Sequence, residues 1–206
     1  MKIITISREF GSGGRELGKR LADTLDFDYY DSEIIEAVAK KSSLDTHYVK
    51  NKLDNHGWQN IPISFHGTLR SVGYTQSNNV QLLLKQKEVI EEIARLDKDC
   101  VIVGRNADVI LHPYSPFNIF VCAEVEAKIK RCIERRTEDE TISEKDLLRK
   151  MRQIDKRRAQ TRAILSGSEW GRRDAYHLIA NTTHWNIKEL APAVAEFASR
   201  WFGRTQ

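Results

Sequence analysis

The sequence has few cysteines, and their spacing matches no metal site. The three are Cys100, Cys122 and Cys132, an odd number. Cys100 and Cys122 lie inside apolar runs, so we expect them to be buried free thiols in a reducing compartment. This pattern argues against a disulfide framework and against a structural zinc site, and we predict no metal-ligating residue.

Long hydrophobic runs are also missing. No apolar run approaches ~18 residues, the length that a transmembrane helix needs. The first residues do not resemble a signal peptide, because Arg8 and Glu9 interrupt the apolar run soon after it begins. We therefore expect a cytoplasmic protein with no membrane partner.

Neither sign of charge dominates. The 206 residues include 33 basic and 29 acidic side chains, which gives a net charge of +4. Dedicated nucleic-acid-binding proteins usually carry a stronger basic excess, so we expect no nucleic-acid partner. A mild excess suits a small anionic substrate. The hydrophobic content of 40% is typical of a globular protein with a sizeable core, and we expect one domain over residues 1–206.

The first twenty residues carry the clearest motif. Residues 2–6 read K-I-I-T-I, which is typical of a strand, and residues 14–25 have leucines four apart, as in an amphipathic helix. The glycine-rich turn S-R-E-F-G-S-G-G-R-E connects them at residues 7–16. A strand, turn and helix in this order direct backbone N–H groups toward an anion, usually a phosphate. The turn therefore predicts phosphate binding, although a simple tight connection is the alternative.

Short apolar strands alternate with helices along the rest of the chain. Further strands are expected at 26–30, 100–103, 117–122 and 176–180, and helices at 34–41, 44–53, 80–96, 124–136, 143–165 and 186–201. This alternation predicts an α/β fold with a parallel sheet covered on both faces. The stretches 44–96 and 124–168 are long insertions that leave from carboxyl ends of strands, where ligands bind in such sheets.

Residues 55–79 form the least regular stretch, with scattered aromatics such as Trp58 and Phe65. Such a loop either covers a ligand or partner site or fills the core. These aromatics could equally mark an oligomer contact, so a homo-oligomer is possible.

Arginines follow the predicted strands and fill the second insertion. Arg105 comes directly after the strand at 100–103, where a guanidinium can bind phosphate in bidentate fashion; an ion pair with Asp108 is the alternative. Asp31 could bind a ribose or base, or cap a helix. The many arginines of residues 124–168 could form a lid that brings positive charge to a phosphoryl group, or a solvated face paired with acids. We expect at least two of them to contact phosphate.

These motifs together resemble the cytidylate kinase family, and more closely its divergent cytidylate kinase-like branch. The matching segments are I-S-R-E-F-G-S-G-G-R-E at 6–16, Y-Y-D-S-E-I-I at 29–35, V-G-R-N-A-D at 103–108 and a block between 154 and 171. The resemblance implies a three-layer P-loop NTPase fold with a five-stranded parallel sheet in the order 2-3-1-4-5. It implies an acceptor-binding insertion at 44–96, a helical lid at 124–168, and Mg²⁺-dependent transfer of the γ-phosphate of ATP to a CMP-like nucleoside monophosphate.

The resemblance and the residue patterns together predict three groups of site residues. The acceptor nucleotide would be bound by Asp31, Ser32, Arg105 and Asp155. The phosphates of ATP would be bound by Arg8, Gly11, Ser12, Gly13, Gly14, Arg15, Glu16, Arg131 and Arg135. The catalytic residues would be Arg15, Arg157 and Arg158.

The turn departs from the P-loop pattern at two positions. The lysine that reaches the β- and γ-phosphates falls on Gly14, and the metal-binding threonine falls on Glu16. Arg15 is the obvious substitute for the lysine, and Arg8 is another. Glu16 could hold Mg²⁺, repel phosphate, or only favour the start of the helix. Two hypotheses stay open: an active kinase with an altered turn, and a non-catalytic nucleotide-binding protein.

Overall fold

A computed structural model describes residues 1–31, 35, 79–135 and 142–204 of the chain. Ser32, the predicted helix at 44–53, the loop at 55–79 except its last residue, and nearly all of the predicted helix at 34–41 lie outside the described residues.

Five strands form one parallel sheet, in the order β2-β3-β1-β4-β5. The strands are β1 (Ile3–Arg8), β2 (Asp28–Asp31), β3 (Cys100–Val103), β4 (Phe117–Cys122) and β5 (Leu178–Asn181). The predicted number, direction and order of the strands are confirmed. Several boundaries differ from the prediction by one or two residues: β1 continues to Arg8, and β2 and β5 each begin two residues later than expected. Arg8 is therefore the last residue of a strand, which fixes its backbone.

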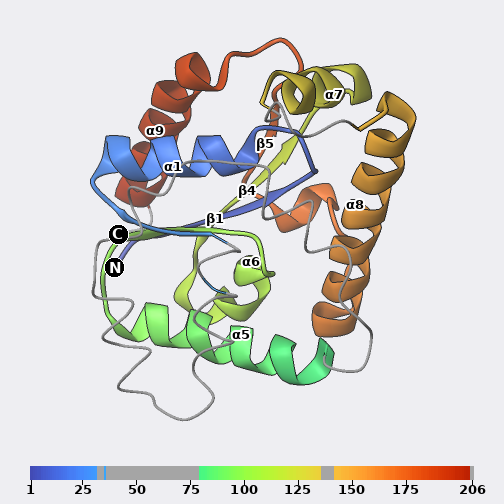
Figure 1. Cartoon of the computed structure of the whole chain (residues 1–206). Helices are drawn as coiled ribbons and strands as arrows, with labels where there is room; N and C mark the ends of the chain where they lie inside the picture. The colour runs from blue at the N-terminus through green and yellow to red at the C-terminus, as the bar shows by residue number, and fades with distance from the viewer. Residues whose placement is uncertain (32–34, 36–78, 136–141, 205–206) are drawn as a thin grey trace.

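Helices cover both faces of this sheet. They are α1 (Gly14–Leu25), α5 (Asn79–Arg95), α6 (Ala107–Ile110), α7 (Val125–Glu134), α8 (Glu144–Ser166) and α9 (Ile187–Arg204), with 3₁₀ turns η4 (His112–Tyr114) and η5 (Arg173–Ala175). Figure 1 shows α1 and α9 on one side of the sheet and α5 and α6 on the other. Sequence periodicity did not predict α6, because four residues are too few to establish a helical repeat.

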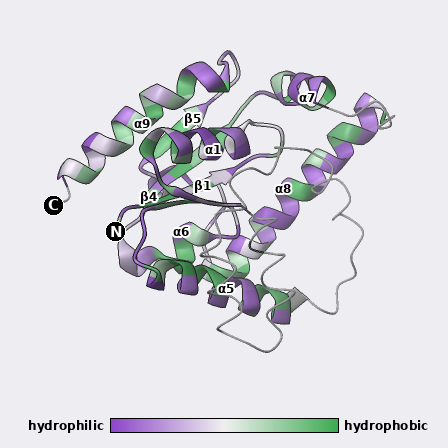
Figure 2. Ribbon diagram, turned by 60° about the vertical axis from the view of Figure 1, so that its left-hand side comes forward, coloured by the Kyte–Doolittle hydropathy of each residue, from purple (hydrophilic) through white to green (hydrophobic). Residues whose placement is uncertain are grey.

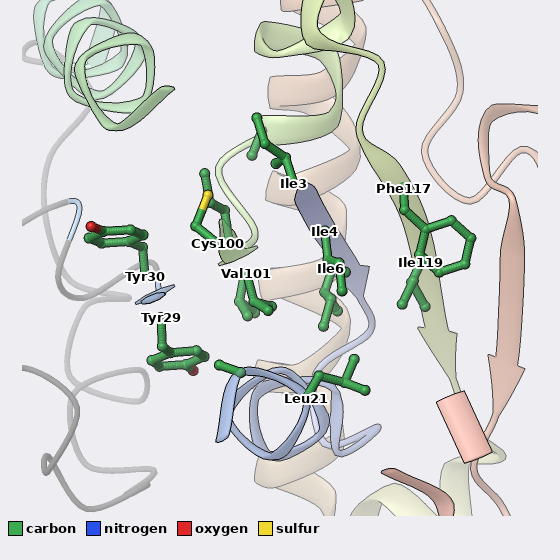
Figure 3. Packing of buried hydrophobic residues seen from close by; sticks show 14 of the residues in the cluster. Ile3, Ile4, Ile6, Leu21, Tyr29, Tyr30, Cys100, Val101, Phe117 and Ile119 are labelled. Atoms are coloured by element: carbon green, nitrogen blue, oxygen red, sulfur yellow. The ribbon is translucent and has the colours of Figure 1, made fainter. Parts of the chain in front are cut away.

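The main core lies between the sheet and its helices. Figure 3 shows Ile4, Ile6 and Val101 of the central strands near Leu21 of α1. Strands with both faces covered need apolar residues at successive positions, which the run at residues 3–6 supplies except at Thr5. The approach of α1 is close: a Cβ at Gly18 would lie 2.5 Å from a methyl group of Val103. This packing fixes the start of α1 beside the carboxyl ends of the central strands.

A second, smaller core attaches the second insertion to the glycine-rich turn. Its central side chain is Phe10, which is 3% exposed. The surrounding residues come from α7 and α8, and they are Ile129, Cys132, Leu147, Met151 and Ile154. Figure 2 shows hydrophilic residues along much of the rest of α8. The turn is thus packed directly against the helices of the predicted lid.

The three cysteines are free thiols, with Cys100 and Cys132 buried and Cys122 half-buried. Burial raises the pKa of Cys132 to about 11, so its thiol stays protonated at neutral pH. Within the described part of the chain, none of the helices is both long and apolar enough to cross a membrane.

Candidate active site

The glycine-rich turn occupies the carboxyl end of β1. Gly11 and Gly13 have φ angles of +77° and +83°, a conformation that glycine adopts without strain. Gly13 is the N-cap of α1 and offers no side chain to the first-turn N–H groups. Together, the helix dipole and these N–H groups form a favourable environment for an anion. Ser12 stays within the turn, where its hydroxyl donates a 2.8 Å hydrogen bond to the carbonyl of Glu9.

Arg131 of α7 contacts backbone carbonyl groups around the turn. Its guanidinium donates to the carbonyl oxygens of Gly11 at 3.5 Å and of Trp185 at 3.3 Å, and also to that of Thr182. The hydroxyl of Thr182 in turn donates to the carbonyl of Ser12 at 2.6 Å. Arg131, which we predicted to bind phosphate, therefore connects α7, the turn and the segment after β5.

Glu16 lies between two arginines. It is 8% exposed and forms ion pairs with Arg20, at 2.8 Å, and with Arg135. Burial raises the pKa of Glu16, but the hydrogen bonds and charges of the two arginines prevail and hold it below its usual value. Glu16 and Arg135 were both predicted to bind the phosphates of ATP, and in this structure they bind each other.

Arg15 points toward the carboxyl end of β2. Its guanidinium lies 2.6 Å from the carboxylate of Asp31, the last residue of β2, and Asp31 is 2% exposed. The hydroxyl of Tyr29 donates to the Arg15 carbonyl at 3.3 Å. Arg15, the predicted substitute for the P-loop lysine, is thus paired with a residue that we assigned to the acceptor.

Three arginines from distant parts of the chain converge beside the turn. Arg8 ends β1, Arg105 follows β3, and Arg158 comes from α8. Burial lowers the pKa of Arg8 well below its usual value, and the positive charges of Arg158 and Arg105 are the next largest causes. The pKa of Arg158 is also lowered, mainly by burial and in part by Arg105, although Asp155 opposes the shift. Positive charge is therefore concentrated at this edge of the sheet.

The turn that carries Arg105 is strained. Gly104, Arg105 and Asn106 have φ angles of +84°, +56° and +53° in succession. Residues other than glycine adopt this region at a cost of roughly 1–2 kcal/mol each, and such strain concentrates at functional sites. A Cβ at Gly104 would overlap the guanidinium of Arg8, so a side chain at this position would displace the end of Arg8. The strained turn therefore brings Arg8 and Arg105 together.

Asp155 and Arg158 attach α8 to the glycine-rich turn. Both carboxylate oxygens of Asp155 accept from the N–H of Phe10, at 2.9 and 3.2 Å. Arg158 donates to Asp155 and to the carbonyl of Arg8, each at 2.9 Å. Arg157, which we predicted to be catalytic, is exposed on α8, and Arg158 faces the turn. Asp155, predicted to bind the acceptor, here binds the backbone of the turn.

A buried ion pair joins α8 to α6. The guanidinium of Arg162 contacts the carboxylate of Asp108, and these side chains are only 5% and 2% exposed. Arg162 also lies 5.5 Å from the ring centre of Tyr176. The sequence suggested Asp108 as an alternative partner for Arg105, and the structure pairs it with Arg162. Nothing in the local pattern could have shown this, because 54 positions separate the two residues.

Sequence reasoning also missed Lys128 and Glu9. The ammonium of Lys128, from α7, lies 2.8 Å from the carboxylate of Glu9 in the turn. The available signal was that the turn itself lacks a lysine, so a cation from another part of the chain is needed.

Across the described residues, no group of three or more His, Cys, Asp or Glu side chains is placed to hold a metal ion.

A profile of the cytidylate kinase-like family matches residues 3–184 of the chain. A search of curated proteins found no match.

Among solved structures, an uncharacterized protein from Eubacterium ventriosum is similar, with a TM-score of 0.69 and 24% identity over 97% of this chain and 99% of that one. Shikimate kinases from Bacteroides thetaiotaomicron and Acinetobacter baumannii have TM-scores of 0.54 and 0.51. Their identities are 13% and 15%, each over 96% of this chain and over 98% and 92% of theirs, so they inform on the fold alone. They support the predicted P-loop NTPase fold.

Proposed function

The chain belongs to the cytidylate kinase-like family, and on this basis we propose that it transfers the γ-phosphate of ATP to a nucleoside monophosphate, with a CMP-like acceptor. Membership of the family supports a phosphotransferase of the kinase type in general. The donor, the acceptor and the role of each residue are our proposal.

The observation that carries the proposal is the convergence of Arg8, Arg105 and Arg158 beside the glycine-rich turn. Phosphoryl transfer needs little covalent chemistry from the protein, and it depends on positive charge held around the transferred group in a site shielded from water. The charges of Arg158 and Arg105 lower the pKa of Arg8, and the charge of Arg105 lowers that of Arg158, so an anion placed between these half-buried side chains would stabilise them. A phosphoryl group suits this cluster because guanidinium forks match phosphate oxygens.

We assign the two nucleotides to the two sides of this cluster. The turn and the start of α1 would hold the donor phosphates, since they offer backbone N–H groups. Asp31 and Arg105, at the ends of β2 and β3, would hold the acceptor. Ser32 and Arg157 stay as predicted members of the site, and Arg8 and Arg158 would lie between donor and acceptor.

Mg²⁺ would enter this site as part of the MgATP substrate. Glu16, at the position where the resemblance places the metal-binding hydroxyl, is already paired with Arg20 and Arg135. The described residues therefore fit no protein-held magnesium site, and we derive no step from one. Magnesium in such sites keeps several waters and binds substrate phosphates, so few protein ligands are needed.

A second function has support from the turn itself. Without the P-loop lysine, and with Glu16 neutralised inside the protein, the turn could bind a nucleotide and not react with it. The retained cluster of arginines favours the first function, because simple binding does not require positive charge on both sides of a phosphoryl group.

The test is an assay of ADP formation from MgATP against a panel of nucleosides, nucleoside monophosphates and other small hydroxyl acceptors. We expect turnover above the hydrolysis background with CMP or a close relative. Arg158→Lys keeps the charge but loses the planar fork, so it should lower kcat/KM by at least about tenfold. The control Arg149→Lys alters an arginine of the same helix that is 78% exposed, and it should have no effect. ATP binding by calorimetry without turnover on any acceptor would establish the second function instead.

A further inference from the structure

The buried lysine beside the turn is the feature that the proposed function leaves unexplained. We propose that Lys128 of α7 supplies, from outside the turn, the positive charge that the missing P-loop lysine would bring to the phosphates of the donor nucleotide. This inference rests on the proposed function, because it assigns a cation to its donor site. The lysine position of the turn is occupied by Gly14, which has no side chain to offer.

Burial sets Lys128 apart from the other lysines that the structure describes. It is 8% exposed, and it is the only lysine among the described residues that is buried. A buried ammonium group is costly unless it has a partner, and lysine is almost never buried without one. Its partner is the carboxylate of Glu9, at 2.8 Å. A buried lysine at the edge of the sheet where we place the phosphates calls for an explanation. Supplying positive charge to the phosphates of the donor nucleotide is such an explanation.

The backbone of Lys128 is in close contact with the turn. A Cβ at Gly11 would lie 3.0 Å from the Cβ of Lys128 and 3.1 Å from its carbonyl oxygen. Glycine at position 11 therefore lets α7 approach the turn, and Figure 1 shows α7 next to the start of α1. From this position the four-carbon side chain reaches residue 9, inside the turn.

The charge of Lys128 acts on the same groups as the arginine cluster. Burial raises the pKa of Asp155, and the charges of Arg158 and Lys128 oppose that rise. Asp155 accepts from the N–H of Phe10, so the charges of Lys128 and Arg158 both act next to one short stretch of the turn. A phosphate cradled by the turn would lie within reach of both.

The pairing with Glu9 is compatible with phosphate binding. An ammonium group has three donors, so Lys128 can keep Glu9 and still donate to a phosphate oxygen. Glu9 is also held by the N–H of Ala123, at 3.3 Å, so it keeps a partner when Lys128 turns toward the nucleotide. A carboxylate in a phosphate-binding turn would repel the ligand if nothing neutralised it. The simpler alternative is that Lys128 only neutralises Glu9.

The cations expected from the sequence are less available for this role. Arg15 is paired with Asp31, and Arg135 is paired with Glu16. Arg131 donates to backbone carbonyls. Lys128 also has a carboxylate partner, Glu9, but that carboxylate accepts a second hydrogen bond, from the N–H of Ala123.

The test compares four proteins: the wild type, Lys128→Met, Glu9→Gln and the double variant. The readouts are the calorimetric Kd for MgATP and the rate of ADP formation. A charged hydrogen bond to phosphate predicts that Lys128→Met weakens ATP binding by about 10–100-fold. The decisive step is the same substitution in the Glu9→Gln background, where no carboxylate needs neutralising. In that background we expect Lys128→Met to weaken ATP binding by at least about tenfold. Lys130→Met is the matched control, because this neighbouring lysine is 78% exposed and pairs with Glu134 on the surface of α7.

A double variant that binds ATP as well as Glu9→Gln does would overturn the inference, because Lys128 would then act only on Glu9. The double variant leaves no buried charge without a partner, so it keeps the test valid if Lys128→Met alone fails to fold. A wild-type protein that binds ATP without turnover would refute the proposed kinase function, and the Kd values would still test Lys128. A wild-type protein that does not bind ATP would overturn both.

Discussion

Two groups of arginines lie near the glycine-rich turn and the helices around it, and we assign them different roles. The paired arginines contact carboxylates or backbone carbonyls that the fold supplies. They are Arg131, Arg135 and Arg162. The crowded arginines are the three that converge at the carboxyl ends of β1 and β3, and one of them, Arg158, is also paired with Asp155. They are Arg8, Arg105 and Arg158.

The difference separates structural from functional use of one residue type. A paired arginine joins elements: Arg162 joins α8 to α6, and Arg131 joins α7 to the turn and to the segment after β5. Crowded arginines gain little from each other, and burial makes their repulsion larger. An anion placed between them would offset this repulsion. The second group is therefore where we place the phosphates.

The largest effect should come from breaking a paired arginine. Asp108→Ala leaves the charge of Arg162 buried without its carboxylate, and removal of one partner from a buried ion pair costs about 3–5 kcal/mol. Urea unfolding should show this loss. The double variant Asp108→Leu/Arg162→Met should recover most of the lost stability, since it removes both charges. An Asp108→Ala protein as stable as the wild type would show that Arg162 is not a paired arginine in the sense used here.

The next effect should fall mainly on activity. Arg105→Met removes a crowded arginine, and loss of one preorganised donor to a transition state lowers kcat by about 10²–10³-fold. Arg131→Met should behave in the opposite way, with a loss of about 1–3 kcal/mol in the free energy of unfolding as its carbonyl partners go unsatisfied. Steady-state kinetics and urea unfolding of both variants measure the contrast. Equal losses of activity and stability in the two variants would remove the distinction between the groups.

A ligand should stabilise the protein through the crowded arginines. At about 100 times its Kd, a ligand that binds only the folded state adds about 2.7 kcal/mol, or about 5–10 °C in Tm for a chain of this size. We expect ATP or CMP to raise the Tm of the wild type and of Arg135→Met by similar amounts. The rise should shrink in Arg105→Met. Thermal unfolding followed by circular dichroism makes the comparison, and an undiminished rise in Arg105→Met would contradict it.

The smallest effect concerns the acid side of the stability curve. The pKa of Glu16 is held below its usual value, so its ion pairs stabilise the fold above the unfolded pKa. That stability is lost as the pH falls through the folded pKa, below about 4.5. Arg135→Met should make this loss shallower, by less than about 1 kcal/mol because the pair is partly exposed. Urea titrations between neutral pH and pH 3 would detect it, and identical slopes in the two proteins would exclude the contribution.

Most of the architecture could be predicted from local patterns. Apolar runs at residues 3–6, 100–103 and 117–122 mark strands because both faces of a parallel sheet are buried. The turn after β1 was recognisable from its glycines. Helix α6 was not predictable, and neither was the strained backbone at Arg105 and Asn106, because a positive φ in a non-glycine residue depends on the structure around it.

The candidate site was predictable only in part. Arg8, Arg105 and Arg158 were predicted, and the structure brings them together. Arg131 and Arg135 were predicted on equal grounds, and the structure turns them to the protein's own carbonyls and carboxylates. The sequence does not show which arginine forms an ion pair or a hydrogen bond within the fold, because the partner lies more than 50 positions away along the chain.

The sequence alone determined the parallel sheet, the strand order through the family resemblance, and a turn built for an anion, because these follow from local apolar periodicity and from glycine's backbone freedom. Tertiary structure decided which charges remain for a ligand. Ion pairs such as Arg162 with Asp108 and Lys128 with Glu9 form between elements that meet only in the folded chain. The missing lysine could be read from the turn, and its proposed replacement could be found only in the packing of α7 against that turn.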